Sequence, residues 1–250
     1  MTMTISDFEH NIYPKLKEFL WRELSTDCSG HNHQHALRVV KNAKLILQQE
    51  TADYVVVVTA ALLHDVIDRK LFVDTDSQEQ KVRQLLEELN FDDSSIEQIL
   101  YIMKNISFSS GKSEFLKTME AKIVCDADRL DALGALGIIR TIEYGAVHGR
   151  AFYSEENLSE EGNRVRFGKI SDTSLSHFYE KLLKLEALMF TDKGRELAQH
   201  RTCFMREFLE QFYEEVKAAG GRALPLKVGG GFHSPFMTPA VAEFSKDLAG

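Results

Sequence analysis

Apolar residues return at helical spacing along most of the chain. From Ser6 to about Lys217, aliphatic and aromatic side chains recur every three or four positions between Glu, Lys and Gln, the pattern of amphipathic helices. No proline stands between Pro14 and Pro225, and proline disrupts helix interiors. The pattern predicts an all-α domain with helices over residues 6–20, 31–50, 52–68, 77–89, 94–105, 115–136, 173–190 and 193–217.

Several local signals refine this prediction. Ser6 and Glu9 form a capping-box pair, and Pro14 is expected to kink or divide the first helix. Residues 52–68 contain four consecutive valines but also an Ala-Ala-Leu-Leu run without a turn signal, so we interpret them as a buried helix. Gly134 and Gly137 are expected to mark a close helix approach or a break. Residues 150–171 are polar and predict a long loop.

The end of the chain differs in composition. Residues 218–250 contain three of the four prolines and six of the fifteen glycines. We therefore predict a helical domain over 1–217 and a Gly/Pro-rich C-terminal appendage over 218–250.

Composition excludes several classes of protein. The 250 residues carry a formal charge of −8 and are 44% hydrophobic, as in an ordinary globular protein. The acidity argues against a nucleic acid polymer as partner. The longest apolar run, 55–63, is far shorter than the roughly 20 residues of a membrane span. Residues 1–7 lack the features of a secretory signal, so we expect a cytoplasmic protein without a membrane association. The three widely spaced cysteines are expected to be reduced.

Residues that commonly bind metals occur in three separate clusters. In the first cluster, two histidines spaced four apart share a helix face. In the second, a histidine and carboxylates in apolar surroundings require partners. In the third, three carboxylates within six residues repel each other unless a cation or an arginine lies nearby. Each cluster alone also fits a solvated or ion-paired face, but their joint occurrence favours one metal site. The clusters are His31 and His35; His64, Asp65 and Asp68; and Asp126, Asp128 and Asp131.

These clusters lie in the stretches HNHQHALRVV, ALLHDVID and VCDADRLDALGALGIIRTI. In order and spacing they resemble the HD-domain superfamily of metal-dependent phosphohydrolases, specifically a small bacterial branch with nucleotide pyrophosphohydrolases. The resemblance covers about residues 6–217 and implies an HD-domain helical bundle. An acidic protein of this kind would meet a phosphorylated substrate through a bound cation.

The resemblance also implies roles for individual residues. His35, His64, Asp65 and Asp128 match the metal ligands, with Asp131 as the rival for the last position. Mn²⁺ or Mg²⁺ is favoured, and Fe²⁺, Ni²⁺ and Zn²⁺ are compatible with the same donors.

The expected chemistry is hydrolysis by metal-activated water. Asp68, one turn after His64, is the candidate to accept or position the water's proton, so that Asp68, His64 and Asp65 form the catalytic group. Substrate binding is expected of His31, Arg129, Asp131, His177, Lys181 and Lys184.

The favoured substrate is a small phosphorylated molecule, namely a nucleoside triphosphate that yields a monophosphate and pyrophosphate. The alternatives are a 5′-nucleotidase or phosphodiesterase of the same superfamily, and a non-catalytic metal- or nucleotide-binding module.

The appendage resembles a different family. Residues 222–244 are similar to a fragment of malonyl-CoA:acyl carrier protein transacylases, with His233 matching the base. The nucleophilic serine motif is missing, and a base without a nucleophile cannot transfer an acyl group. We therefore expect no transacylase activity from this chain.

Overall fold

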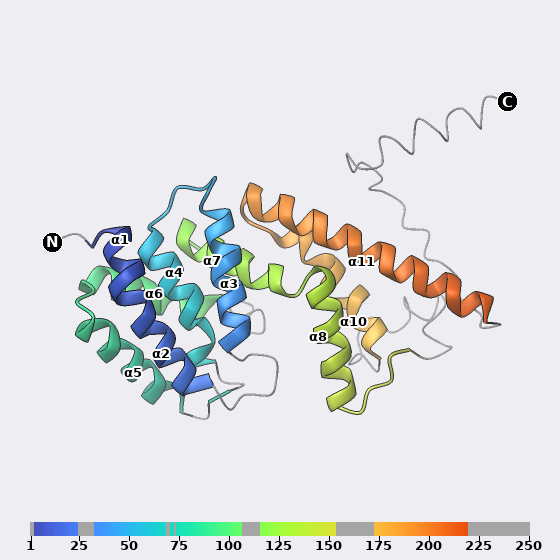
Figure 1. Cartoon of the computed structure of the whole chain (residues 1–250), viewed down its shortest axis with the longest axis horizontal. Coiled ribbons are helices and arrows are strands. Elements are labelled where there is room, and N and C mark those ends of the chain that lie inside the picture. The colour runs from blue at the N-terminus through green and yellow to red at the C-terminus, as the bar shows by residue number, and fades with distance from the viewer. Residues whose placement is uncertain are drawn as a thin grey trace.

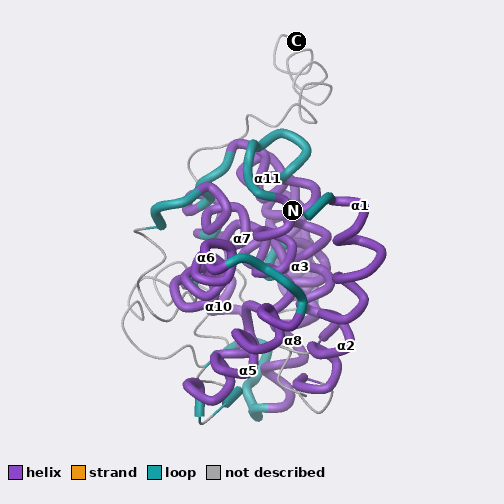
Figure 2. Tube along the Cα trace, turned by 90° about the vertical axis from the view of Figure 1, so that its left-hand side faces the viewer, coloured by secondary structure: helices purple, strands orange, loops and turns teal. Residues whose placement is uncertain are grey.

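A computed structural model describes residues 3–24, 33–68, 71–72, 74–106, 116–153 and 173–219. These residues form helices joined by turns, and their β-structure is limited to an isolated bridge between Ala151 and Thr173. The all-α prediction is confirmed (Figures 1 and 2). Within these residues no helix combines the length and apolar character that a membrane crossing requires. Residues 220–250, with His233, lie outside the described residues, so the boundary at 217 stays a prediction.

The helices divide into two groups along the long axis of the molecule (Figure 1). The first group comprises α1 (Ile5–Asp7), η1 (Phe8–Ile12), α2 (Tyr13–Leu24), α3 (His33–Ile46), α4 (Tyr54–Leu63), η2 (His64–Ile67), α5 (Thr75–Glu88), α6 (Asp93–Asn105) and α7 (Met119–Asp131). The second comprises α8 (Gly134–Val147), α10 (Ser174–Glu180), η6 (Leu182–Lys184), η7 (Glu186–Leu188) and α11 (Asp192–Ala218). The C-terminal end of α7 lies where the groups meet.

The N-terminal helix differs from its sequence prediction in one detail. Its cap is Thr4, whose hydroxyl accepts from the Asp7 amide, so Ser6 is not the N-cap. Glu9 instead accepts from Lys44 and Tyr54 at 2.8 and 2.6 Å. The expected division near Pro14 is present as the π-helix η1, which precedes α2.

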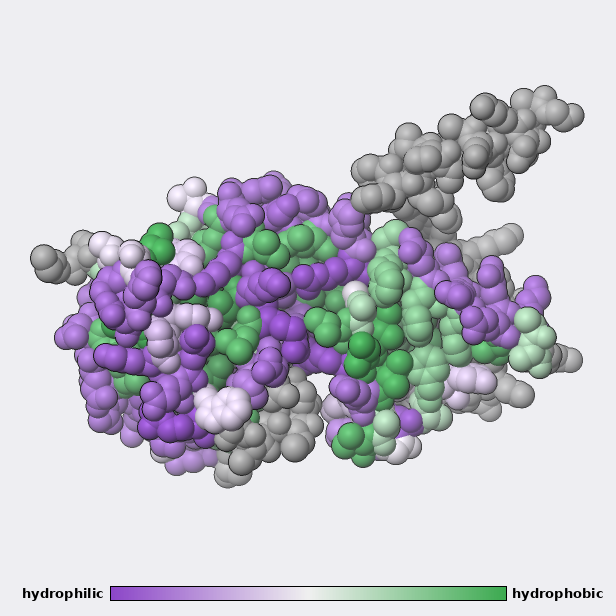
Figure 3. Space-filling view, viewed as in Figure 1, coloured by the Kyte–Doolittle hydropathy of each residue, from purple (hydrophilic) through white to green (hydrophobic). Residues whose placement is uncertain are grey.

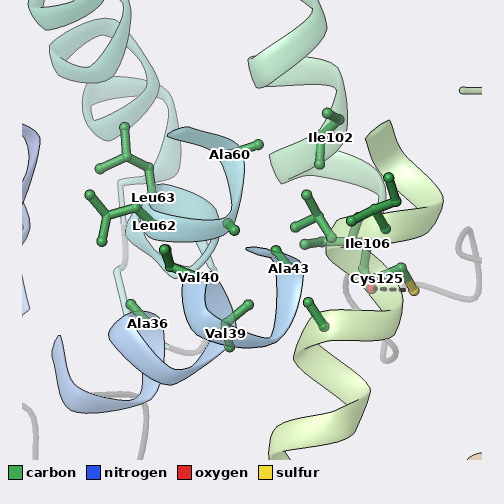
Figure 4. Packing of buried hydrophobic residues seen from close by; sticks show 14 of the residues in the cluster. Ala36, Val39, Val40, Ala43, Ala60, Leu62, Leu63, Ile102, Ile106 and Cys125 are labelled. Atoms are coloured by element: carbon green, nitrogen blue, oxygen red, sulfur yellow. Dashed lines mark hydrogen bonds between the residues drawn. The ribbon is translucent and has the colours of Figure 1, made fainter. Parts of the chain in front are cut away.

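The core of the first group is built around α4. All but two of its ten residues are buried, including three of the four valines, which confirms the buried helix. Asp53 caps it by accepting from the amides of Val55 and Val56. Small residues of α3, such as Ala36 and Ala43, allow α3 to pack closely beside α4 (Figure 4).

Glycine marks the junction between the two groups of helices. Gly134 has a positive φ of 76°, which L side chains adopt with strain, and it separates α7 from α8. A Cβ on Gly137 would lie 2.2 Å from the carbonyl oxygen of Ala132. Of the two predicted alternatives, a close helix approach or a break, the structure confirms the break between α7 and α8.

Helix α8 packs through its small residues. Gly137 and Gly145 are buried, whereas Leu136, Ile139 and Ile142 are exposed. Figure 3 shows hydrophobic residues over this helix and hydrophilic ones between it and the first group. The buried face of α8 therefore consists of glycines and Ile138.

The segment 173–190 is not the single helix that its periodicity predicts. Helix α10 ends at Glu180, and two 3₁₀ turns, η6 and η7, follow. The turns lead the chain to Phe190 and Thr191, which lie beside Asp126 of α7. There the buried carboxylate of Asp126 accepts from the amides of Phe190 and Thr191. This tertiary anchor lies outside local sequence periodicity.

Candidate metal centre

Three elements bring the predicted ligands together. His35 stands on the first turn of α3, and Asp128 stands near the end of α7. His64 and Asp65 begin the 3₁₀ turn that directly continues the apolar helix α4. Because α3 packs against both α4 and α7, residues up to 93 positions apart in the sequence meet at one point.

The side chains meet within a few ångströms. The Nε2 atom of His35 lies 3.5 Å from Asp65 Oδ2 and 3.2 Å from Asp128 Oδ1. The Nε2 atom of His64 lies 3.3 Å from Asp65 Oδ1 and 3.8 Å from Asp128 Oδ1. His35, His64 and Asp65 are buried, whereas the Asp128 side chain is 31% exposed. These four side chains are therefore largely shielded from solvent, and the site is accessible beside Asp128.

Hydrogen bonds on the opposite ring edges orient both imidazoles. His64 Nδ1–H donates to the carbonyl oxygen of Ala61 at 2.9 Å. His35 Nδ1–H donates to Asp131 Oδ2 at 2.7 Å. A carbonyl oxygen only accepts, so Nδ1 of His64 carries the proton and a neutral ring has its lone pair on Nε2. A neutral ring with its proton on Nδ1 carries on Nε2 the lone pair that could bind a metal.

This arrangement suits a cation. The two Nε2 atoms lie 3.3 Å apart, with carboxylate oxygens of Asp65 and Asp128 beside them, and such acceptors repel one another unless positive charge lies among them. Imidazole and carboxylate are common ligands of divalent metals. The cluster of His35, His64 and Asp65 can hold a divalent metal ion.

Asp131 binds the back of this site. Besides His35, it accepts from Arg38 at 2.7 and 3.0 Å and from Arg140 at 2.6 Å. Its side chain is 1% exposed. In this geometry Asp131 faces Nδ1 of His35, away from the Nε2 atoms, so it is placed to orient His35.

The electrostatics match these contacts. Burial by itself would lower the pKa of His35, but its hydrogen bonds with Asp128 and Asp131 outweigh this effect and raise the pKa to about 9. Burial would raise the pKa of Asp131, but hydrogen bonds from His35 and Arg38 hold it well below its usual range. The carboxylates therefore stabilise positive charge at His35, whether a proton or a metal ion supplies it.

The other predicted residues occupy different places. Asp68 ends η2, and its amide donates to the carbonyl oxygen of Asp65 at 3.1 Å. Arg129 donates to the carbonyl oxygen of Leu188 and stacks over the Phe190 ring at 5.1 Å. His31 lies outside the described residues. The catalytic role of Asp68 and the substrate contact of Arg129 stay predictions.

The basic residues of the later segment lie in the second group of helices. His177 stands on α10, Lys181 follows that helix directly, and Lys184 ends η6. Burial, followed by the charges of Lys181 and Arg150, lowers the pKa of His177 to about 4. Lys184 is exposed. Their contacts with substrate also stay predictions.

The sequence analysis did not assign Arg38 or Arg140 to the site, although both donate to Asp131. Arg38 is one turn after His35 on the same helix, a spacing that places both on one face. Arg140 carries no such signal, because it reaches Asp131 only through the break at Gly134.

Comparisons with known proteins point to one family. A family model described as HD domain matches residues 32–133. YpgQ of Bacillus subtilis (strain 168) is 34% identical over 199 residues, which cover 77% of this chain and 88% of YpgQ.

Solved structures agree with this match. An HD-superfamily hydrolase from Bacillus thuringiensis is 38% identical, covers 82% of this chain and 96% of its own, and has a TM-score of 0.66. The structure of B. subtilis YpgQ in complex with ADP is 30% identical, covers 81% and 97%, and has a TM-score of 0.65. With its helical fold and with His35, His64, Asp65 and Asp128 close together, the chain belongs to the HD domain family.

Proposed function

We propose that this protein is a metal-dependent phosphohydrolase that converts a nucleoside triphosphate into a nucleoside monophosphate and pyrophosphate. The observation that carries the proposal is the pair of oriented Nε2 atoms of His35 and His64, flanked by carboxylates of Asp65 and Asp128. The ADP complex of YpgQ supports a nucleotide as the substrate class.

In this proposal His35, His64, Asp65 and Asp128 hold the metal. These two imidazoles and two carboxylates would hold the ion, and Mn²⁺ or Mg²⁺ is favoured. When bound, the cation supplies acidity to a water molecule and neutralises charge on the phosphoryl oxygens.

The proposed reaction is hydrolysis at the α-phosphorus of the nucleoside triphosphate. The water oxygen forms a bond to this phosphorus, and the bond from phosphorus to the oxygen that bridges to the β-phosphate breaks. Pyrophosphate leaves with that electron pair, and Asp68 accepts the proton that the water loses. His31, Arg129, His177, Lys181 and Lys184 are the candidates to hold the substrate.

The test is a nucleotide screen with added Mn²⁺ on the wild type and on His64→Ala and Asp65→Ala. We expect the wild type to release pyrophosphate and each variant to lose this activity, because each loses a ligand. Equal activity of wild type and variants would refute the proposal.

The same screen separates the alternatives. Release of orthophosphate from nucleoside monophosphates would identify a 5′-nucleotidase, and hydrolysis of a diester would identify a phosphodiesterase. Binding of metal and nucleotide without any turnover would identify a non-catalytic module.

A further inference from the structure

We propose that Arg201 of α11, acting through Asn42 of α3, holds the last turns of α7 in the position that the metal centre requires. In this role Arg201 is a positioning residue. The proposal rests on the proposed function, because these turns carry Asp128, one of the proposed metal ligands. Arg201 lies outside residues 32–133, the part of the chain that matches the HD domain family.

The Arg201 guanidinium joins three helices. Helix α11 contacts both α7 and α3, and Figure 1 shows its beginning beside these helices. Arg201 Nη1 donates to the carbonyl oxygen of Leu130, and Nη2 donates to Asn42 Oδ1 at 2.8 Å. The side-chain amide of Asn42 in turn donates to the carbonyl oxygen of Ala127 at 3.0 Å. One arginine of the second group of helices thereby connects α3 with two carbonyl groups of α7.

The two carbonyl groups of α7 stand directly before residues of the metal centre. Ala127 precedes Asp128, whose Oδ1 atom lies 3.2 Å from Nε2 of His35. Leu130 precedes Asp131, whose carboxylate accepts from Nδ1 of His35 at 2.7 Å. The position of the α7 backbone at these two points therefore determines how both carboxylates meet the His35 ring.

Asn42 relates these turns of α7 to His35. It stands seven residues after His35 on α3, and two helical turns take about 7.2 residues, so both side chains lie on one face of the helix. Asn42 is 5% exposed. Its amide has one orientation in which Oδ1 accepts from Arg201 while Nδ2 donates to Ala127. Asn42 is therefore a rigid connection between α3 and α7.

The surroundings of Arg201 hold its side chain in this place. Arg201 is partly buried, and a Cβ on Gly134 would lie 3.3 Å from its Cβ and Cγ atoms, so the glycine leaves the space that the arginine stem occupies. The guanidinium binds the C-terminal end of α7, where exposed carbonyl groups favour a cation. Loss of the arginine would leave the Leu130 carbonyl and the Asn42 amide without this partner.

The experiment measures Mn²⁺ affinity by calorimetric titration of the full-length wild type, Arg201→Met, Arg201→Lys and Asn42→Ala. Urea unfolding without metal gives the stability of each protein. Arg201→Met should weaken Mn²⁺ binding about tenfold, the lower end of the range for residues that orient metal ligands. Arg201→Lys keeps the charge but lacks the planar fork that reaches both acceptors, so it should bind Mn²⁺ with an affinity between those of Arg201→Met and the wild type.

Arg195→Met is the matched control for the loss of an arginine from α11. Arg195 also donates to a backbone carbonyl, that of Met189 at 3.1 Å, and it pairs with Asp192. We expect this variant to keep the Mn²⁺ affinity of the wild type, whatever stability it loses. An equal loss of affinity in Arg195→Met and Arg201→Met would show a general effect of packing and would overturn the assignment.

A double variant, Arg201→Met with Asn42→Ala, tests whether the two residues act as one unit. Residues of one hydrogen-bond network show non-additive effects, so the double variant should bind Mn²⁺ no more weakly than Arg201→Met. Additive losses would contradict the connection through Asn42, and unchanged affinity in every variant would overturn the positioning role. If Arg201→Met does not fold, Arg201→Lys and Asn42→Ala decide the question by the same criterion.

Failure of the proposed function gives a different result. Mn²⁺ binding by a wild type that hydrolyses no triphosphate would refute the proposed function, and the affinities of the variants would still decide the role of Arg201. No Mn²⁺ binding by the wild type would overturn the metal centre and the role of Arg201 with it.

Discussion

The replacement Asp131→Asn tests whether Asp131 orients His35 at the candidate metal centre. Asp131 accepts hydrogen bonds from His35, Arg38 and Arg140 at 2.6 to 3.0 Å. An asparagine offers one acceptor oxygen, and its amide group would face donors. The variant therefore leaves His35 without a fixed orientation and the two arginines without their anion.

The burial of Asp131 determines how much stability the Asp131→Asn variant is expected to lose. Removal of one partner from a buried ion pair costs about 3–5 kcal/mol. The side chains of Arg38 and Arg140 are 31% and 25% exposed, so water compensates them in part, and we expect a loss of about 3 kcal/mol in the free energy of unfolding. Loss of a residue that orients a metal-binding histidine costs about 10- to 100-fold in metal affinity.

The assay is urea unfolding of the metal-free protein, together with calorimetric titration of Mn²⁺ into the folded protein. Asp126→Asn is the matched control, because Asp126 is also a buried aspartate of α7 but accepts from Phe190 and Thr191. We expect both variants to lose stability and only Asp131→Asn to lose Mn²⁺ affinity. Equal Mn²⁺ affinities for Asp131→Asn and the wild type would refute the orienting role.

Three further predictions concern packing, capping and pH. Gly145→Ala should lower the free energy of unfolding by about 1–3 kcal/mol, because its Cβ would lie 2.1 Å from Ser174 Oγ; an unchanged urea midpoint would contradict the close packing. Asp74→Ala should lower the free energy of unfolding by about 1 kcal/mol, because the Asp74 carboxylate accepts from the Ser77 amide at the start of α5. Thermal unfolding measures this loss, with Asp76→Ala as the control. Burial, followed by the charges of Lys181 and Arg150, lowers the pKa of His177 from 6.5 to about 4. Between about pH 4 and 6.5 the unfolded state therefore binds more protons than the folded state. As a result, His177 makes the free energy of unfolding rise with pH in this range. His177→Gln should flatten that rise in urea unfolding, and an unchanged slope would show that His177 is not buried as a neutral ring.

The proximity of His35, His64, Asp65 and Asp128 could be predicted from sequence because each part has a local signal. His64 and Asp65 follow a run of apolar residues directly, and charge at the end of a buried helix requires partners. His35 and Asp128 lie on flanking helices with apolar stripes, so burying those stripes also brings the ligands toward α4. The family resemblance supplied the preference for Asp128 over Asp131 as a metal ligand, which stays a prediction; the Asp131 carboxylate accepts from Nδ1 of His35.

The residues around the ligands depend on tertiary structure that the periodicity does not contain. Asp126 stands two residues before Asp128 in the same stretch of sequence. Its carboxylate nevertheless accepts hydrogen bonds from the amides of Phe190 and Thr191, in the segment after η7. Arg140 reaches the site only because the chain turns at Gly134. The predicted helix over 173–190 was wrong for the same reason, since its apolar spacing continues through turns that are no longer α-helical.

Hydrolysis of a nucleoside triphosphate in ¹⁸O-labelled water, with Mn²⁺ present and ³¹P NMR as the readout, tests the proposed reaction most directly. We predict that the label enters the phosphate of the monophosphate, that pyrophosphate is released unlabelled, and that His64→Ala forms neither product. Label in pyrophosphate or in orthophosphate would place the attack at another phosphorus and contradict the account. Equal product formation by His64→Ala would contradict the role of the metal centre.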